Sequence, residues 1–151
     1  MRPRTLVVLV CVSVLVVITL SGCLLDATSP GVADITFTIT PSIFWVGVQE
    51  EITCNISESN GIGVDLNYAK ATWYDEQGGL YGEEEREGEE AQELFDEIFG
   101  THYLPPNVTL QIITPGPIIE TGPPGRVVVT IGGTDDNGNF VTDSWEGEIR
   151  A

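Results

Sequence analysis

Hydrophobic and polar residues follow two different patterns in this chain, one at its start and one repeated through the rest. Residues 6–20 form an apolar run interrupted by one serine and one threonine, with arginine but no acidic residue before it. Later, apolar and polar residues alternate, as in Ile35, Phe37 and Ile39, which are separated by threonines. Because side chains of an extended strand point alternately to its two faces, this alternation predicts strands with one buried face.

The alternation returns in several short segments with turn residues between them. We expect strands at residues 33–40, 43–48, 51–57, 65–74, 108–114, 126–134 and 140–149. Asn137-Gly138 lies between the last two, and this dipeptide favours a type I′ β-hairpin because both residues tolerate positive φ. About seven short strands separated by turns are typical of an all-β protein with an antiparallel β-sandwich.

The residue sizes on one face of the strand at 65–74 indicate what packs against it. Ala69, Ala71 and Trp73 fall on one face of this strand. Two small residues beside a large ring predict a position to which a second sheet comes close.

Residues 83–100 break the rhythm of the strands and predict an acidic helical insertion. A charge run of four glutamates and one arginine occupies 83–87, and residues 89–99 have the pattern of a helix. Ala91 begins an apolar stripe with the spacing i, i+3, i+4 and i+7. Acidic residues in the first turn complement the helix dipole, and Gly100 suits a C-terminal cap.

The apolar stripe of this helix has two interpretations. It packs inside its own chain, across an open end or edge of the sandwich, as most amphipathic helices of globular domains do. Alternatively it docks into a groove on a partner protein through Leu94, Phe95, Ile98 and Phe99, in which case added salt weakens the binding.

The first apolar run ends in the motif Leu20-Ser21-Gly22-Cys23, after a start that carries Arg2 and Arg4. A charged start, an apolar middle and a small-residue cut site are the parts of a secretory signal peptide. The motif resembles the lipobox of prokaryotic lipoproteins, whose cysteine is lipidated and becomes the mature N-terminus. The resemblance implies a signal peptide at 1–22, a lipidated Cys23 and a short tether at 23–32.

The alternative is an uncleaved anchor, although the run is shorter than the ~20 apolar residues of a spanning helix. Both interpretations place residues 33–151 on the extracytoplasmic face of the cell membrane, because the arginines remain on the cytoplasmic side. A lipidated cysteine with two acyl chains is sufficient for stable anchoring.

Charge excludes one class of partner. The chain has 23 acidic and six basic residues, a formal net charge of −17 and a pI of about 4.1. Beyond the predicted signal peptide only Lys70, Arg86, Arg126 and Arg150 are basic. Such a surface repels nucleic acid and attracts cations, so we expect no nucleic-acid partner. Either a salt-rich habitat or the local acidic runs account for the charge.

The cysteines allow no disulfide within the folded domain. Cys11 lies in the predicted signal peptide and Cys23 is the predicted lipid site, which leaves Cys54 alone. Because Ile52 and Ile56 share its face, we expect a buried thiol that behaves as a small apolar side chain.

Several short motifs resemble the opening of immunoglobulin-like domains. Pro41-Ser42 precedes Val46-Gly47-Val48 and then the cysteine-bearing Ile52-Thr53-Cys54-Asn55-Ile56, and Trp73-Tyr74 is similar to their third strand. The resemblance implies an immunoglobulin-like β-sandwich across residues 33–150. One departure is that Val127–Ile131 offers no cysteine to pair with Cys54.

Oxygen-bearing side chains gather at the last hairpin, at Asp135, Asp136, Asn137, Asn139 and Asp143. Calcium is bound by six to eight such oxygens, so this cluster is a candidate metal site, and calcium is the one cofactor we consider. The spacing differs from an EF-hand loop, and a solvated hairpin explains the same residues.

Asn55 and Asn107 each begin an Asn-x-Ser/Thr sequon and are candidate glycosylation sites. His102 is the only histidine, and the chain has no Gly-x-Ser-x-Gly, His-Glu-x-x-His or glycine-rich phosphate motif. We therefore expect no catalytic residues and no enzyme.

The sequence predicts a lipid-anchored, non-catalytic binding or interaction module of the cell envelope. Its expected partners are the membrane, through the N-terminal lipid, and an envelope or extracellular protein. The alternative function is a calcium- or solute-binding accessory subunit of an envelope complex.

Overall fold

Two sheets face each other in the computed structural model, which describes residues 31–116, 119 and 124–151. The predicted signal peptide and most of the tether lie outside these residues. The described elements are β1 (Ile35–Thr40), β2 (Ile43–Trp45), β3 (Glu51–Glu58), β4 (Val64–Asp75), β5 (Leu80–Glu87), α2 (Glu89–Phe99), β6 (Tyr103–Leu104), β7 (Thr109–Pro115), β8 (Gly125–Asp135) and β9 (Phe140–Arg150). None of the helices in this part of the chain has the length and apolar character needed to cross a membrane.

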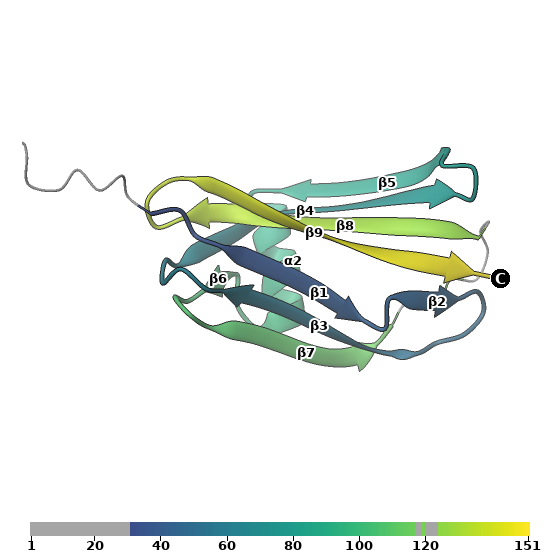
Figure 1. The fold of residues 1–151 in the computed structure, drawn as a ribbon. Helices are drawn as coiled ribbons and strands as arrows, with labels where there is room; N and C mark the ends of the chain where they lie inside the picture. The colour runs from purple at the N-terminus through teal and green to yellow at the C-terminus, as the bar shows by residue number, and fades with distance from the viewer. Residues whose placement is uncertain (1–30, 117–118, 120–123) are drawn as a thin grey trace, which may run out of the picture. The chain divides into compact units, whose positions relative to one another are not determined.

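The smaller sheet has the strand order β1–β3–β7 and the larger one β2–β9–β8–β4–β5, with β6 paired to the start of β4 (Figure 1). All of these pairs are antiparallel except the short one between β2 and β9, which is parallel. The predicted all-β sandwich with one short helix is therefore confirmed.

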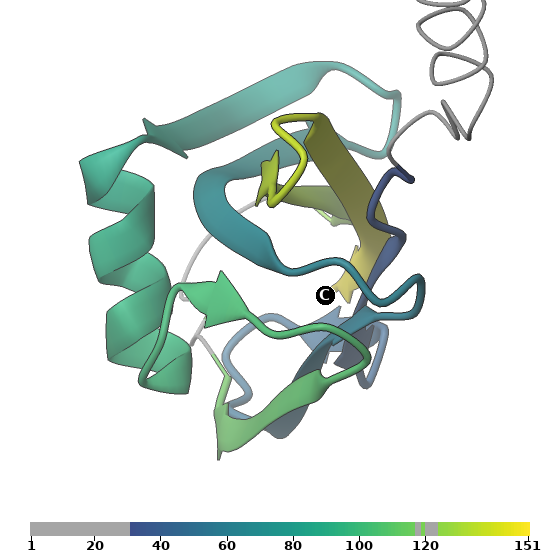
Figure 2. The ribbon, with the colours of Figure 1, turned by 90° about the vertical axis from the view of Figure 1, so that its left-hand side faces the viewer.

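Helix α2 closes one side of the sandwich. It contacts β4 and β5 of the larger sheet and β7 of the smaller one, and Figure 2 shows it running between the levels of the two sheets. Ala91 and Phe95 on its inner face are 0% and 3% exposed and belong to the core. The helix has the predicted bounds, and Gly100 is its left-handed C-terminal cap, with φ of 76°.

The burial of Phe95 corrects the docking interpretation for that residue, because a side chain inside the core cannot meet a partner. Leu94, Ile98 and Phe99 are half-buried. Leu94 lines a hollow of about 310 Å³ together with Ala69 and Ala71. The neighbour of these two small residues is therefore the helix, where the sequence predicted a second sheet.

The charge run was wrongly predicted to lie outside the sheets. Residues 83–87 belong to β5, which pairs along its length with β4. Lys70 of β4 lies between two glutamates of the run, with Nζ 3.0 Å from Glu83 and 3.7 Å from Glu85. Opposite charges on neighbouring strands stabilise their pairing, so only the helix interrupts the strands here.

The last hairpin is confirmed, but its turn is of another type. The amide of Gly138 donates to the carbonyl of Asp135 at 2.8 Å, and that of Asp135 to the carbonyl of Asn139 at 2.8 Å. Only Gly138 in this turn has positive φ, at 84°, whereas a type I′ turn needs it at two residues. The loop thus has the three-residue form, with glycine in the left-handed position.

Core residues come from both sheets and from the helix. They comprise Ala33, Ile35, Phe37, Ile56, Val64, Leu66, Ala91, Phe95, Leu104, Ile131 and Val141. Cys54 is also buried, and its burial raises the pKa of the thiol. Because every member of this core lies in the compact unit 32–151, we expect that unit to fold without the residues before it.

Phe95→Ala should destabilise residues 32–151 by about 3–5 kcal/mol, because it removes a large side chain from the core and leaves a cavity. Glu93→Ala, on the exposed face of the same helix, serves as the control and should change stability by less than about 0.5 kcal/mol. Urea unfolding followed by circular dichroism measures both. Equal stability of the two variants would show that the helix does not contribute to the core.

Candidate binding site at one end of the sandwich

The chain enters the sandwich at one end, and a hollow lies in the surface at the opposite end. The amide of Ala33 donates to Asp135 in the last hairpin at 3.1 Å, and the carbonyl of Val32 accepts from Asn60 at 3.0 Å. Strand β1 runs from this end to the opposite one, where β2 follows. The hairpin and the turn after β3 therefore surround the entry of the chain.

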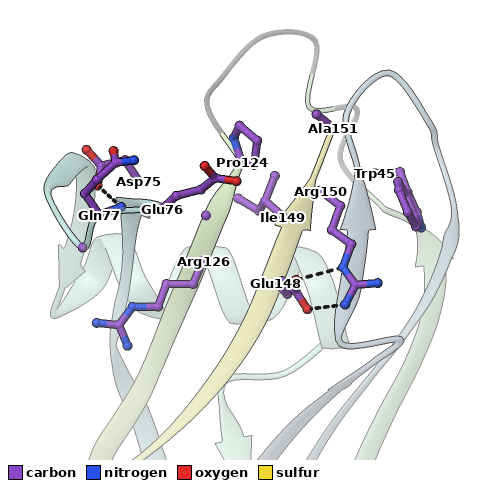
Figure 3. Close-up of a pocket in the computed structure, with 12 residues that line it drawn as sticks. Trp45, Asp75, Glu76, Gln77, Pro124, Arg126, Glu148, Ile149, Arg150 and Ala151 are labelled. Atoms are coloured by element: carbon purple, nitrogen blue, oxygen red, sulfur yellow. Dashed lines mark hydrogen bonds and ion pairs between the residues drawn. The ribbon is translucent and has the colours of Figure 1, made fainter.

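The hollow at the opposite end has a volume of about 930 Å³. Four separate segments form it: the end of β2, the turn between β4 and β5, the start of β8 and the end of β9 (Figure 3). Its lining residues are Trp45, Asp75, Glu76, Gln77, Gly78, Pro124, Gly125, Arg126, Glu148, Ile149, Arg150 and Ala151. Asp75 holds its turn together by accepting the amides of Gln77 and Gly79 at 3.0 and 2.6 Å.

Two of the four basic residues of the sandwich lie at this hollow. Arg150 makes two hydrogen bonds of 2.8 Å to Glu148, which hold the pKa of that carboxyl below its usual value. Arg126 lies 4.5 Å from the ring centre of Tyr74 and 3.1 Å from Glu146. Both guanidinium groups are exposed, so they remain accessible to a ligand.

An aromatic ring completes the hollow. Trp45 is 41% exposed, and the guanidinium of Arg150 lies 5.8 Å from its ring centre. Exposed tryptophan and arginine side chains are the residues that most often dominate the binding energy of protein interfaces. The arrangement suits binding by stacking and charge-assisted hydrogen bonds.

The predicted calcium ligands are mostly engaged with the protein itself. Asp135 is buried, and its carboxylate accepts hydrogen bonds from the amides of Ala33, Asn137 and Asn139 and from the side chain of Asn139. Burial alone raises the pKa of Asp135, but these hydrogen bonds outweigh it and lower the pKa. The structure therefore brings Asp135, Asn137 and Asn139 together as hydrogen-bond partners of one another.

Asp136 and Asp143 point to other partners. Asp136 accepts a hydrogen bond from the hydroxyl of Tyr103 at 3.0 Å. Asp143 lies three residues into β9, about 10 Å from the hairpin loop, and accepts the amide of Phe37 at 2.7 Å. Within the described residues, no group of three or more histidine, cysteine, aspartate or glutamate side chains is placed to hold a metal ion.

Sequence reasoning missed a second buried carboxylate, Glu58, at the same end of the sandwich. It is 3% exposed and accepts amides from three loops: Asn60 at 2.8 Å and Gly61 at 2.9 Å, Asn107 at 2.9 Å, and Asp34 at 3.4 Å. Burial alone raises its pKa, but the amide hydrogen bonds outweigh this and lower it. The sequence pattern could have indicated its burial, because Glu58 continues the alternation that buries the apolar residues of β3.

The remaining candidates occupy the surface. Asn55 lies on the outer face of β3, where it bonds to Thr38 and Gln111. Asn107 has φ of 56° and an exposed side chain. His102 stays at the surface with Nδ1 2.9 Å from Asp96.

Comparison with family models and with curated proteins found no match. Among solved structures, the ApaA protein from Bordetella pertussis is 16% identical, with 78% of this chain and 94% of ApaA covered and a TM-score of 0.50. Spo0M, a sporulation control protein from Bacillus subtilis, is 13% identical (80% of this chain, half of Spo0M, TM-score 0.46). The CARDB domain of PF1109 from Pyrococcus furiosus, solved with di-metal ions, is 18% identical (82% and 97%, TM-score 0.39).

At these identities the likeness concerns the fold alone. The described part of the chain is a β-sandwich domain of the immunoglobulin-like type, with a helix between its sheets at one side.

Glu58→Gln should lower the stability of residues 32–151 at pH 7 by about 1–3 kcal/mol, because an amide replaces a charged acceptor of four N–H groups. Because the folded pKa values of Glu58 and Asp135 lie below those of the unfolded chain, the stability they contribute is complete above about pH 4.5 and falls as the pH falls. The difference between variant and wild type should therefore shrink towards pH 3. Urea unfolding at several pH values measures it, and a difference independent of pH would contradict the role of the charge.

Proposed function

We propose that this protein is a lipid-anchored module of the cell envelope that binds a protein partner outside the cytoplasm. The observation that carries the proposal is the opposite placement of two features. The chain enters the sandwich beside Asp135, whereas the hollow with Trp45, Arg126 and Arg150 lies at the other end.

This placement suits a protein held at its N-terminus. Ten tether residues, 23–32, reach at most about 35 Å when extended. Strand β9 has 11 residues, so the hollow lies roughly 30 Å further along the sandwich. A lipid on Cys23 would therefore be attached at the end of the sandwich opposite to the hollow, which leaves the hollow open to partners on other molecules.

The charge of the domain favours a protein over a lipid surface as the partner of the hollow. Anionic headgroups are repelled by the acidic domain as a whole. Arg126 and Arg150 keep exposed N–H groups that their bonds to Glu146 and Glu148 do not use, and these can donate to a partner. Trp45 offers an apolar plane. No described arrangement favours the calcium alternative, because the oxygens of Asp135 already accept hydrogen bonds.

Cys23→Ala should abolish processing and lipidation. Intact mass spectrometry of the protein from membrane fractions should show, for the wild type, a chain that begins at Cys23 and carries a diacylglyceryl group. The variant should keep residues 1–22. A wild-type chain that retains Met1, or an unmodified thiol at Cys23, would contradict the anchor while leaving the hollow untouched.

The partner can be sought by photo-crosslinking in intact cells. A benzophenone amino acid at position 45 should give a discrete adduct. The matched control is position 140, because Phe140 is also exposed, at 59%, but lies at the entry end. Arg126→Ala should reduce the adduct at position 45 by about tenfold, the loss expected of one charge-assisted contact. Adducts from position 140 alone would contradict the assignment of the hollow.

A further inference from the structure

The strand orders of the two sheets end in four outer strands, and three of these are protected against pairing with another chain. Strand β2 has only three residues, and β5 carries the charged residues Glu83–Glu87. The amide of Phe37 in β1 and that of Ala33 just before it donate to the carboxylates of Asp143 and Asp135. Short length, charge and covered amides are means by which proteins block an open sheet edge. The fourth outer strand, β7, carries no charged residue.

Hydrogen bonds at the two ends of β7 determine which of its main-chain groups face its neighbour β3. Just before β7, Glu58 N donates to the carbonyl of Val108 at 3.0 Å, and just after it, Gly116 N donates to the carbonyl of Glu50. Bonded pairs alternate along an antiparallel ladder. With the observed register, the even-numbered residues of β7 therefore bond to β3.

The N–H and C=O groups of Thr109, Gln111 and Ile113 consequently point to the open edge. All three residues are exposed, and no hydrogen bond among the described residues uses their main-chain N–H groups. Pro115 occupies the next outward position, where its missing N–H costs no bond, as is usual for proline in an edge strand. The usable open edge is thus residues 109–113.

The centre of the face beside this edge is also free of charge. Residues 32–151 contain 22 acidic and four basic residues, a formal charge of −18. The central residues on the outer face of the smaller sheet are nevertheless all uncharged: Thr36, Thr38, Thr40, Thr53, Asn55, Ser57, Thr109, Gln111 and Ile113. The outer-face side chains of β7 that two copies would bring together, Thr109, Gln111 and Ile113, therefore place no like charges opposite each other.

We propose that β7 pairs in antiparallel fashion with β7 of a second copy, with the two-fold axis at Gln111. Thr109 of each copy then lies opposite Ile113 of the other, and the two Gln111 residues face each other. Each copy donates three outward N–H groups and receives three, so all outward N–H and C=O groups of residues 109–113 are satisfied. Leu110 and Ile112 on the inner face extend the apolar surface across the contact.

Self-complementarity is what favours a second copy as the occupant. The same antiparallel pairing of β5 would place glutamates opposite glutamates, which is destabilising. A two-fold contact through β7 joins two three-stranded sheets into one of six strands and closes the edge. This inference does not depend on the anchor or on the hollow.

The test is sedimentation equilibrium of unglycosylated residues 32–151 at 10 µM to 1 mM. The wild type should form dimers, and more of them as salt rises, because screening weakens the repulsion between acidic copies. Gln111→Pro should weaken the dimer about 30-fold, at roughly a factor of five for each of two hydrogen bonds. Its fold should persist, because the lost N–H points away from β3; circular dichroism checks this.

Charged substitutions at position 111 test the register of the two β7 strands. Gln111→Glu and Gln111→Lys should each dimerise less than the wild type, since like charges then face each other, and an equimolar mixture of the two should recover the dimer. A wild type that stays monomeric at 1 mM would overturn the proposal. A dimer that survives Gln111→Pro, or a mixture that associates no better than the separate variants, would also overturn it, because the contact would lie elsewhere.

Discussion

Carboxylates that accept main-chain amides hold this sandwich together at the end where the chain enters. Asp143 of the larger sheet accepts an N–H group of β1, Asp135 accepts that of Ala33 just before β1, and Glu58 accepts those of three loops. A buried carboxylate without these donors is strongly unfavourable, and so are buried amides without an acceptor. Each group therefore requires the other, and the two sheets and their loops adopt one relative arrangement at this end.

The strands could be predicted where their side chains alternate between apolar and polar, because burial of one face imposes that period. Strand β5 escaped prediction because residues 83–87 are all charged and show no apolar–polar alternation; Lys70 of the neighbouring strand lies close to two of its glutamates. Strand β6 has two residues and is too short for any period. The helix could be predicted in full because its stripe, its acidic first turn and Gly100 agree.

Less of the candidate site could be predicted. Oxygen-rich composition made Asp135 and Asp143 resemble metal ligands, whereas strand register places Asp143 well beyond the loop and gives both residues main-chain partners. The hollow was missed because Trp45 and Arg150 are separated by more than 100 residues in the sequence. Only the parallel pairing of β2 with β9 brings them together, and a pair of three residues leaves no pattern in the sequence.

The link between β1 and β2 bears on whether a reducing agent can separate the two sheets. Between Thr40 and Ile43 the chain leaves the smaller sheet and joins the larger one, so a covalent bridge of two residues ties the sheets together. Antibody domains place a disulfide between their sheets, whereas Cys54 is the only cysteine of this unit and is free. The two sheets of this unit are therefore joined without a disulfide that a reducing environment could break.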